Sequence, residues 1–548
     1  MIQYSCLESW YHMNNFTIKR SFFQIPSTKC IKEYEKIDIF IKILKKSGIN
    51  KIIESVKNEQ KNCKGRNNYN PYNMMATILY CFSEFKSSVR ELEKLCYTDL
   101  RIMYLMEQNE PSYATFCDFI NKYIKPYSLE IFSMVTNAII NEYNIDVKNQ
   151  YIDGTKIEAN ANKYKFVWKP KTYHKKLDIK IKELINDMNY EYEGEKYIKA
   201  EEFVNIIKNY SDINNIDFYD IPNGKGKRLT KEQKIIKYGY EYLNRLIDYE
   251  EKEKICGEDR NSYYKTDKDA TAMVLKEDYY SKLSHDFHAA YNTQVIVSSG
   301  FITMYGIFQK RDDQNTLIPM LKRYYKGYGN YPNNLCGDSG YGTYINYEFL
   351  KKNNIGNYLK FNSWNGETSG KRPKLFFLNN NGFKCLNDIS GKHIFTKSHS
   401  RYADSKFYIF NGCNNCNYSY KCKEFLKDKS QDFRKAELSI KYETYKDEAR
   451  KNLLSPDGIE IRVNRSIQVE GTYGQIKQNM NYTRFRRKGI TSVECEFMLE
   501  CLGVNIRKLF KIIEDSKLIK KSYWNRPQDL QNESFPVVKP KEKKMSRK

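Results

Sequence analysis

The period of the hydrophobic pattern changes near residue 148, and this change constrains the fold of the 548-residue sequence more than any other feature. Between about residues 35 and 146, apolar residues recur every three or four positions, as in amphipathic helices. After that point short, strand-like apolar runs take over, beginning with VKNQYIDGTKIEA. The order that follows is strand, insertion, strand, strand, helix, strand, helix and strand. It predicts an α/β fold with a sheet of mixed direction.

Two segments interrupt this order. The stretch from about 160 to 265 is rich in Lys, Glu and Tyr and predicts a helical insertion, whereas about 365–445 is rich in Gly, Asn, Lys and Cys and has no regular period. We therefore expect a helical N-terminal DNA-binding domain at 1–147, an α/β domain at 148–510 that carries both insertions, and a basic, disordered tail at 511–548. Periodicity alone also allows the N-terminal helices to be a bundle that only packs on the rest.

The charge of the sequence points to a polyanion as partner. There are 92 Lys and Arg against 67 Asp and Glu, a formal charge of +25, which attracts nucleic acid by counterion release. No apolar run of about 18 residues and no signal peptide occur, so we expect a soluble, cytoplasmic, nucleoid-associated protein without a membrane partner. Most of the 14 cysteines lie within ordinary helical or strand patterns and predict buried free thiols.

Two aspartates close predicted strands and are followed by glycine. Asp153 lies in YIDGTKIEANANKY and Asp338 in NNLCGDSGYGT. Asp-Gly alone favours a turn. Two such acids at the ends of the first and fourth strands of one sheet instead favour a site for a hard cation such as Mg²⁺. The glycine would then leave room beside the carboxylate.

A third acid lies on a predicted helix. In VEGTYGQIKQNM, helical spacing places Glu470, Tyr473 and Lys477 on one face. Alone, this pattern is an ordinary solvated helix face. Together with the two aspartates it suits a metal ligand beside a phosphate contact.

The motifs occur in a recognisable order. DGTKIEANANKY, TDKDATAM at 266–273, YNTQ at 291–294, GDSGYGT at 337–343 and VEGTYGQIK at 469–477 resemble transposases of the IS1182 group within the wider IS4 class of DDE transposases. The resemblance covers most of the chain and implies an RNase H-like catalytic domain. It further implies that Asp153, Asp338 and Glu470 form the catalytic triad and hold two Mg²⁺ ions, or Mn²⁺ in their place.

The implied reaction is DNA transposition by an insertion sequence. Two-metal cleavage at the element ends would free a 3′ hydroxyl, which would then attack target DNA. The implied partners are the terminal inverted repeats and target DNA, bound by a homodimer in the synaptic complex. Two alternatives stay open: an RNase H-like nuclease that does not transpose, and a zinc-stapled DNA-binding protein without catalysis.

The wider class carries a Tyr, Arg, Glu and Lys signature around its glutamate. Lys477 stands seven residues after Glu470 as that signature asks, but Ser466 occupies the arginine position, with Arg465 one residue earlier, and the tyrosine is missing. We assign DNA contact to Lys477 and Arg465.

Downstream, NYTRFRRKG places Tyr482 and Phe485 among basic residues, a mixture that suits phosphate binding and stacking on a displaced base. The basic residues assigned to DNA here are Arg484, Arg486, Arg487 and Lys488.

Four cysteines of the irregular region form a further candidate site. Cys413 and Cys416 have CxxC spacing, and Cys385 and Cys422 are close enough in sequence to complete a tetrahedral Zn²⁺ site. The region has little apolar content of its own, so a metal would explain how it folds. Free or redox-active thiols are the alternative.

Overall fold

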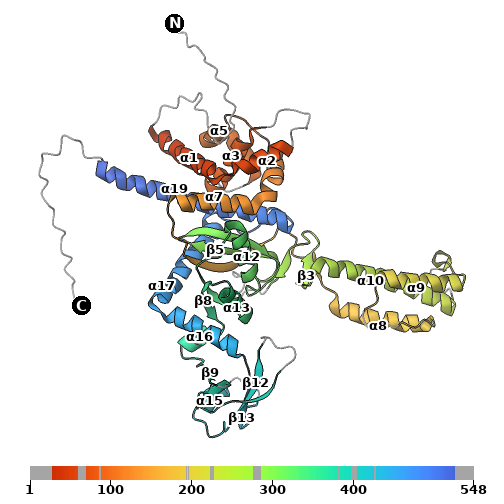
Figure 1. Cartoon of the computed structure of the whole chain (residues 1–548). Coiled ribbons are helices and arrows are strands. Elements are labelled where there is room, and N and C mark those ends of the chain that lie inside the picture. Colours follow the sequence, from red (N-terminus) through yellow and green to blue (C-terminus); the bar gives the residue numbers. More distant parts are fainter. Residues whose placement is uncertain are drawn as a thin grey trace, which may run out of the picture.

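The computed structural model describes residues 28–524 apart from short gaps. The gaps are 60–68, 85–87, 193, 195–196, 223–227, 259, 276–285, 381, 397–403 and 425–427. A central sheet is covered on one side by the N-terminal helices, a long helical arm leaves the body to one side, and a small β-rich insertion lies at the end opposite those helices (Figure 1).

The central sheet mixes parallel and antiparallel strands, as the sequence predicts. Its strands are β1 (Asn149–Glu158), β4 (Thr271–Met273), β5 (His288–Ser298), β6 (Phe301–Phe308), β7 (Asn334–Gly342) and β8 (Gly356–Phe361). The spatial order is β6-β5-β1-β7-β8, with the short β4 also paired to β5. The pairs β6-β5 and β5-β1 are antiparallel, whereas β1-β7 and β7-β8 are parallel.

Local sequence explains the connections within the sheet. The hairpin between β5 and β6 turns at Ser299 and Gly300, which both have positive φ (48° and 75°), the backbone of a tight two-residue turn. The parallel strands are joined through α12 (Leu317–Tyr328) and α13 (Tyr344–Lys352), as parallel pairs require. The predicted order of strands and helices is therefore present.

Helices cover both faces of the sheet. Alternate residues of β1 point to opposite sides: Tyr151 and Ile157 join one apolar core, and Ile152 joins the other. The first core contains the N-terminal helices and α19 (Ile490–Trp524), and the second contains α12, α13 and α16 (Ile440–Leu454).

The N-terminal helices share their core with the sheet. They are α1 (Thr28–Ser47), α2 (Asn50–Glu59), α3 (Pro71–Glu84), α4 (Val89–Thr98), α5 (Leu100–Leu105), α6 (Tyr113–Phe119), η1 (Ile120–Ile124), η2 (Lys125–Tyr127) and α7 (Ser128–Glu142). Helix α19 packs on α3, α7 and β6, so residues from both ends of the chain form one apolar cluster. Gly503 allows this approach, because a Cβ there would lie 2.2 Å from the Phe82 carbonyl oxygen.

The structure locates two of the predicted domain boundaries. The boundary at residue 147 separates segments with a common core, and the boundary at 510 lies inside α19. The tail beyond residue 524 lies outside the described residues.

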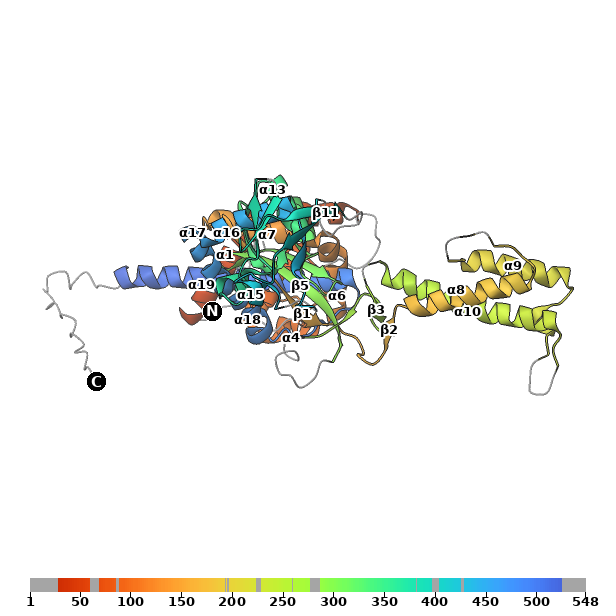
Figure 2. The same cartoon turned by 90° about the horizontal axis from the view of Figure 1, so that it is seen from below.

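The helical insertion is an arm with a core of its own. It comprises β2 (Phe166–Trp168), α8 (Lys171–Asp187), α9 (Ala200–Ile213), η3 (Phe218–Asp220), α10 (Lys231–Cys256) and β3 (Ser262–Tyr264). Strands β2 and β3 pair with each other at its base. Thirteen buried residues between Leu177 and Leu246 form a cluster that includes no residue of the body. The arm extends away from the body in both ribbon views (Figure 2).

The Cys-rich insertion consists of short strands around a very small core. Its elements are α14 (Trp364–Thr368), β9 (Phe376–Asn379), β10 (Gly382–Cys385), β11 (Lys392–Thr396), β12 (Lys406–Asn411), α15 (Ser419–Cys422) and β13 (Phe433–Leu438). Only Phe383, Tyr408 and Phe410 are fully buried in its apolar cluster.

A broken helical segment follows α16 and leads to α19. It contains α17 (Pro456–Arg465), η4 (Ser466–Glu470), α18 (Gly471–Gly474) and η5 (Gln475–Asn479), of which η4 and η5 are π-helical. None of the helices in the described part of the chain combines the length and apolar character that crossing a bilayer requires.

Candidate active site

Asp153 lies in the middle of β1, not at its end as the sequence analysis expects. Thr155 and Ile157 are β-branched and continue the pairing with β5 as far as Glu158, which explains the longer strand. Asp153 shares its face of the sheet with Tyr151 and Ile157, and its side chain is 15% exposed. Its carbonyl oxygen, together with that of Thr293, accepts a hydrogen bond from the buried Tyr473 hydroxyl (3.1 and 3.0 Å).

Gly154 has a different role from the one its sequence suggests. It faces the opposite side of the sheet from Asp153, and a Cβ there would lie 1.9 Å from the Gln294 Nε2. Gln294 is its partner across β5. The glycine therefore makes room for that glutamine, on the side of the sheet away from the Asp153 carboxylate.

Asp338 lies beside Asp153 on the neighbouring strand. Strand β7 also continues past its acid, to Gly342, and pairs in parallel with β1 so that Tyr151 lies opposite Cys336. Two residues further along both strands, the same register sets Asp153 opposite Asp338 on one face, where strands are about 4.8 Å apart. Consistent with this, burial and then the charges of Asp313, Asp153 and Asp338 raise the pKa of Tyr341 well above its ordinary value.

Basic side chains from two other elements surround the two carboxylates. Arg465, at the end of α17, is 12% exposed and places its Nη1 3.5 Å from the Asp153 Oδ2. On β8, Lys360 follows Leu359, the partner of Gly337, at the point where the register with β7 shifts, and its charge interacts with those of Arg465 and Asp338. Burial, followed by the charge of Arg465, lowers the pKa of Lys360. The two acids are thus neutralised in part by partly buried cations.

Glu470 does not join the two aspartates here. It ends η4 with an exposed side chain, whereas Tyr473 is buried, so the two do not share a face as predicted. Glu470 closes the π turn of η4, whose helical period differs from that of an α-helix. Across the described residues, no three or more His, Cys, Asp or Glu side chains form a group that could hold a metal ion.

The same π turn accounts for the displaced arginine of the signature. A π turn contains one residue more than an α turn, so the residue five before Glu470 takes the position that an α-helix gives to the residue four before it. That residue is Arg465, whereas Ser466 is exposed. Lys477 lies half-exposed in η5.

Asp313 is an acidic residue of the site that sequence reasoning missed. Its Oδ1 accepts hydrogen bonds from Asn292 and Gln294, both at 2.8 Å. A Cβ built on Gly340 would lie 3.8 Å from the Asp313 Cβ and 3.0 Å from the Asp338 Oδ1, so the two acids are close. The signal in the sequence is the acidic pair that follows the apolar strand β6, in KRDDQN.

The basic segment 481–489 runs along the end of β1. The Phe485 amide donates to the Glu158 carbonyl oxygen (2.8 Å), and Asn160 donates to the carbonyl oxygen of Arg486 (2.7 Å). The exposed basic side chains are those of Arg484, Arg486 and Lys488, and Arg487 is half-buried.

The predicted base-stacking role of the aromatic residues in this segment is wrong. Tyr482 and Phe485 are only 3% and 1% exposed, because both side chains pack into the core beneath the segment.

The four cysteines of the insertion surround one small cavity of about 20 Å³. Cys385, Cys413, Cys416 and Cys422 all line it, and all are free thiols. Burial, and then the nearby thiol of Cys422, raises the pKa of Cys413. The four residues thus converge from β10, from the turn after β12 and from α15, although they do not meet the geometry of a metal cluster noted above.

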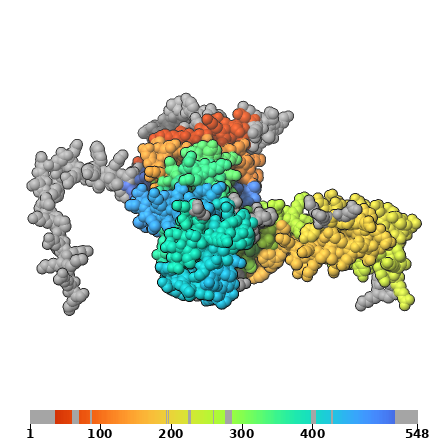
Figure 3. Space-filling model, turned by 60° about the horizontal axis from the view of Figure 1, so that its bottom comes forward, coloured from red at the N-terminus to blue at the C-terminus, as the bar shows by residue number. Residues whose placement is uncertain are grey.

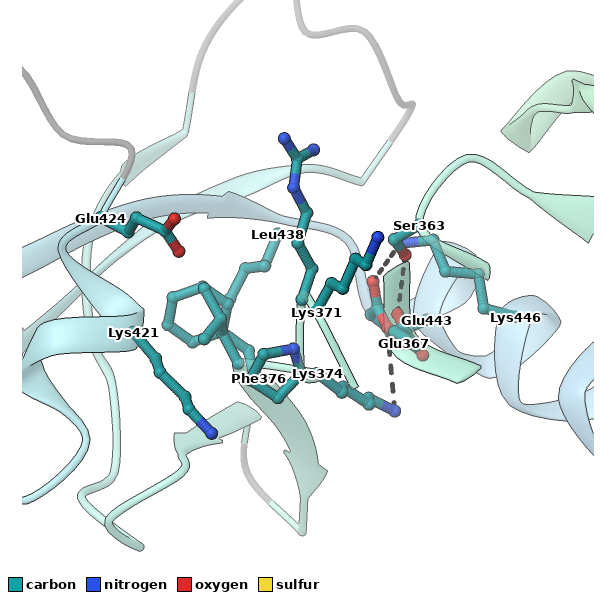
Figure 4. A pocket seen from close by; sticks show the side chains of 13 residues that line it. Ser363, Glu367, Lys371, Lys374, Phe376, Lys421, Glu424, Leu438, Glu443 and Lys446 are labelled. Atoms are coloured by element: carbon teal, nitrogen blue, oxygen red, sulfur yellow. Dashed lines mark hydrogen bonds and ion pairs between the residues drawn. The ribbon is translucent and has the colours of Figure 1, made fainter. Parts of the chain in front are cut away.

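The pocket drawn in Figure 4 has a volume of about 280 Å³ and lies between the insertion and α16. Two of its lysines are paired with acids: Lys374 contacts Asp447 at 2.7 Å, and Lys446 contacts Glu443 at 2.6 Å. None of the predicted site residues lines it, so it is separate from the aspartate pair.

Two family models match the sequence. One, described as a Transposase DDE domain, matches residues 387–510, and the other, described as a Transposase domain (DUF772), matches residues 32–122. The first range contains Arg465, Glu470 and three of the four clustered cysteines, and the second covers the N-terminal helices from α1 into η1. No curated protein and no solved structure matches the chain.

Proposed function

This chain is a DDE-type transposase of an insertion sequence, and from that premise we propose that it cuts DNA at the ends of its element and joins the freed 3′ hydroxyl to target DNA. The pair of DDE and DUF772 matches is typical of the IS1182 group, to which we assign it. The matches lend no support to the wider IS4 class. The strand order β6-β5-β1-β7-β8, with the last two strands parallel to β1, supports an RNase H-like catalytic domain.

One observation carries the proposal. The parallel register of β1 and β7, continued two residues past the pair Tyr151–Cys336, brings Asp153 and Asp338 to the same face, beside the partly buried Arg465. Such closeness of two carboxylates has an electrostatic cost, and a catalytic cation site is a reason to retain them together.

DDE domains generally use divalent metal ions such as Mg²⁺. The carboxylate oxygens of Asp153 and Asp338 are hard donors of the kind that Mg²⁺ or Mn²⁺ binds, so this pair fits such an ion. We assign the third ligand to Glu470, whose exposed side chain has to turn toward the pair. When bound, two such ions activate an attacking hydroxyl and stabilise the leaving oxygen.

The other residues position the acids and the DNA. Arg465 orients the Asp153 carboxylate through their 3.5 Å contact, and Tyr473 fixes the backbone of β1 at that residue. Asp313 holds Gln294 at the edge of the site.

We assign phosphate binding at the inverted repeats and the target to the basic residues near this site. They are Lys477, Arg484, Arg486, Arg487 and Lys488. The N-terminal helices contribute further DNA contacts, and two copies act together on nucleoid DNA.

Replacing Asp153 with Asn tests the catalytic assignment. The variant keeps the size of the side chain and removes its charge, so cleavage of a DNA with an element end should disappear while binding of that DNA remains. Asp248→Asn, an exposed change in the arm, is the matched control and should cut normally. Cleavage by Asp153→Asn in Mg²⁺ would refute the assignment.

The same assay separates the alternatives. A nuclease that does not transpose would cut the end without joining it to target DNA. A DNA-binding protein without catalysis would be unaffected by chelation of Mg²⁺.

We also propose a structural Zn²⁺ among Cys385, Cys413, Cys416 and Cys422. Their convergence on one small cavity supports it, as does the small size of the insertion's apolar cluster, which has three buried members among the described residues. The purified chain should contain about one zinc per molecule by elemental analysis. Cys416→Ser should lose it and the buried control Cys501→Ser should retain it. Equal zinc content in both variants would refute the site and leave free thiols as the explanation.

A further inference from the structure

The helical part of the arm, residues 171–256, differs in charge from the rest of the chain. It carries 17 Lys and Arg and 17 Asp and Glu, so its formal charge is zero and the remainder of the chain carries the whole +25. Since binding to DNA gains most of its affinity from neutralised phosphates, a neutral surface contributes little to it. The arm is therefore poorly suited to DNA, although it belongs to a DNA-processing protein.

The arm also exposes many large apolar side chains. This segment is less than a sixth of the chain, yet it holds eight of the 26 exposed large apolar residues among the described residues. They are Tyr173, Ile179, Tyr190, Tyr197, Ile213, Tyr219, Tyr238 and Ile247. Five of them are tyrosines, a residue type enriched in protein interfaces. These side chains give the arm exposed apolar area that contact with another protein can bury.

The arm is built to present this surface. Its own core holds α8, α9 and α10 together without help from the body, and the arm stands clear of the body in the space-filling view (Figure 3). The exposed residues are distributed over all three helices and the turns between them, so most of the length of the arm is available for contact.

We propose that the arm binds the arm of a second copy of this chain. The whole formal charge of +25 lies outside the helical part of the arm, so the bodies of two copies repel each other. Two copies can therefore approach most closely through their neutral arms. This inference rests on the proposed function in one respect, since joining two element ends requires two copies to be held together. An arm-to-arm contact in a closed dimer uses the same surface on both copies.

The mass of the full-length chain in sedimentation velocity tests this contact, without DNA and with element-end DNA. The variant Ile213→Arg/Tyr219→Arg changes the two most exposed apolar residues of the arm (78% and 90%). The variant Tyr238→Arg/Ile247→Arg changes two on α10. The matched control Ile345→Arg/Leu454→Arg changes body residues that are 61% and 54% exposed.

We expect the unchanged chain and the body control to sediment as dimers. At least one arm variant should dissociate to monomers with a dimer affinity lowered by roughly a hundredfold or more, as when two interface anchors are lost. Thermal unfolding at the unchanged temperature would verify that the variants are folded. Dimers that persist in both arm variants, or a wild-type chain that is monomeric with and without DNA, would refute the proposal.

The result is independent of catalysis. If Asp153→Asn still cuts DNA but the arm variants are monomeric, the catalytic assignment falls and the arm contact stands. If the arm variants remain dimeric while Asp153→Asn is inactive, the arm contact falls and the catalytic assignment stands.

Discussion

Replacing Tyr473 with Phe removes a single oxygen atom between the two central strands. In the native chain its hydroxyl donates to the carbonyl oxygens of Asp153 and Thr293 at 3.1 and 3.0 Å, in a fully buried position. The variant keeps the ring and its packing. Only the shared hydrogen bond that joins α18 to β1 and β5 is lost.

The expected cost follows from this geometry. One proton is shared by two buried acceptors, so the loss amounts to one net hydrogen bond plus part of the cost of poorly satisfied carbonyl groups, about 1–2 kcal/mol in the free energy of unfolding. A small displacement of the Asp153 backbone should also lower the rate of DNA cleavage by about tenfold.

Tyr264→Phe is the matched control. Tyr264 is equally buried, but among the described residues its hydroxyl has no hydrogen-bond partner. Its removal should leave the free energy of unfolding unchanged or slightly higher. Urea titration of both variants and cleavage of an end-containing DNA give the comparison. Equal unfolding free energies and equal cleavage rates for the two variants would refute the positioning role of Tyr473.

Three further predictions follow from the same region. Gly154→Ala should lower the free energy of unfolding by about 1–3 kcal/mol, because the new methyl group would displace Gln294. Adding Gln294→Ala to the same chain should recover part of this loss. Strictly additive losses of the two substitutions in urea titrations would contradict this reasoning. Arg465→Gln should lower the rate of cleavage at the element end at least about tenfold, with little change in binding of that DNA. The control Arg245→Gln, an exposed change in the arm, should cut normally. Equal cleavage rates for the two variants would exclude the positioning role of Arg465. Burial raises the pKa of Tyr151 and Tyr264 from 10.0 to about 12, so the stability that these tyrosines contribute is present below pH 10 and is lost as the pH rises toward 12. A urea midpoint that stays constant across that interval would show that these tyrosines do not ionise on unfolding.

The sequence predicts the sheet well because short-range patterns determine it. Short apolar runs and the turn at Ser299 and Gly300 place the strands, and the chain order of strands and helices fixes a mixed sheet. The ends of the strands were predicted less well. Asp153 and Asp338 look like terminators, yet the backbone pairing continues past both, since neighbouring strands supply the hydrogen bonds that a lone strand lacks.

Other parts of the site depend on contacts that no local pattern contains. The purpose of Gly154 is set by Gln294, 140 residues later, and Asp313 approaches Asp338 only through the loop that follows β6. The burial of Tyr482 and Phe485 depends on α19 and the sheet. The π turns before and after α18 leave no clear mark in the composition of the helix.

The insertion of the arm between β1 and β5 also sets the order in which the chain can fold during its synthesis. The three helices of the arm are complete, with their core, once residue 256 has left the ribosome. Strand β1 then still awaits β5 and β7, and the core beneath the N-terminal helices awaits α19. Because long-range pairing is slow and leaves apolar surface open in the meantime, the nascent chain cannot complete its principal core until nearly the last tenth of the protein has been made.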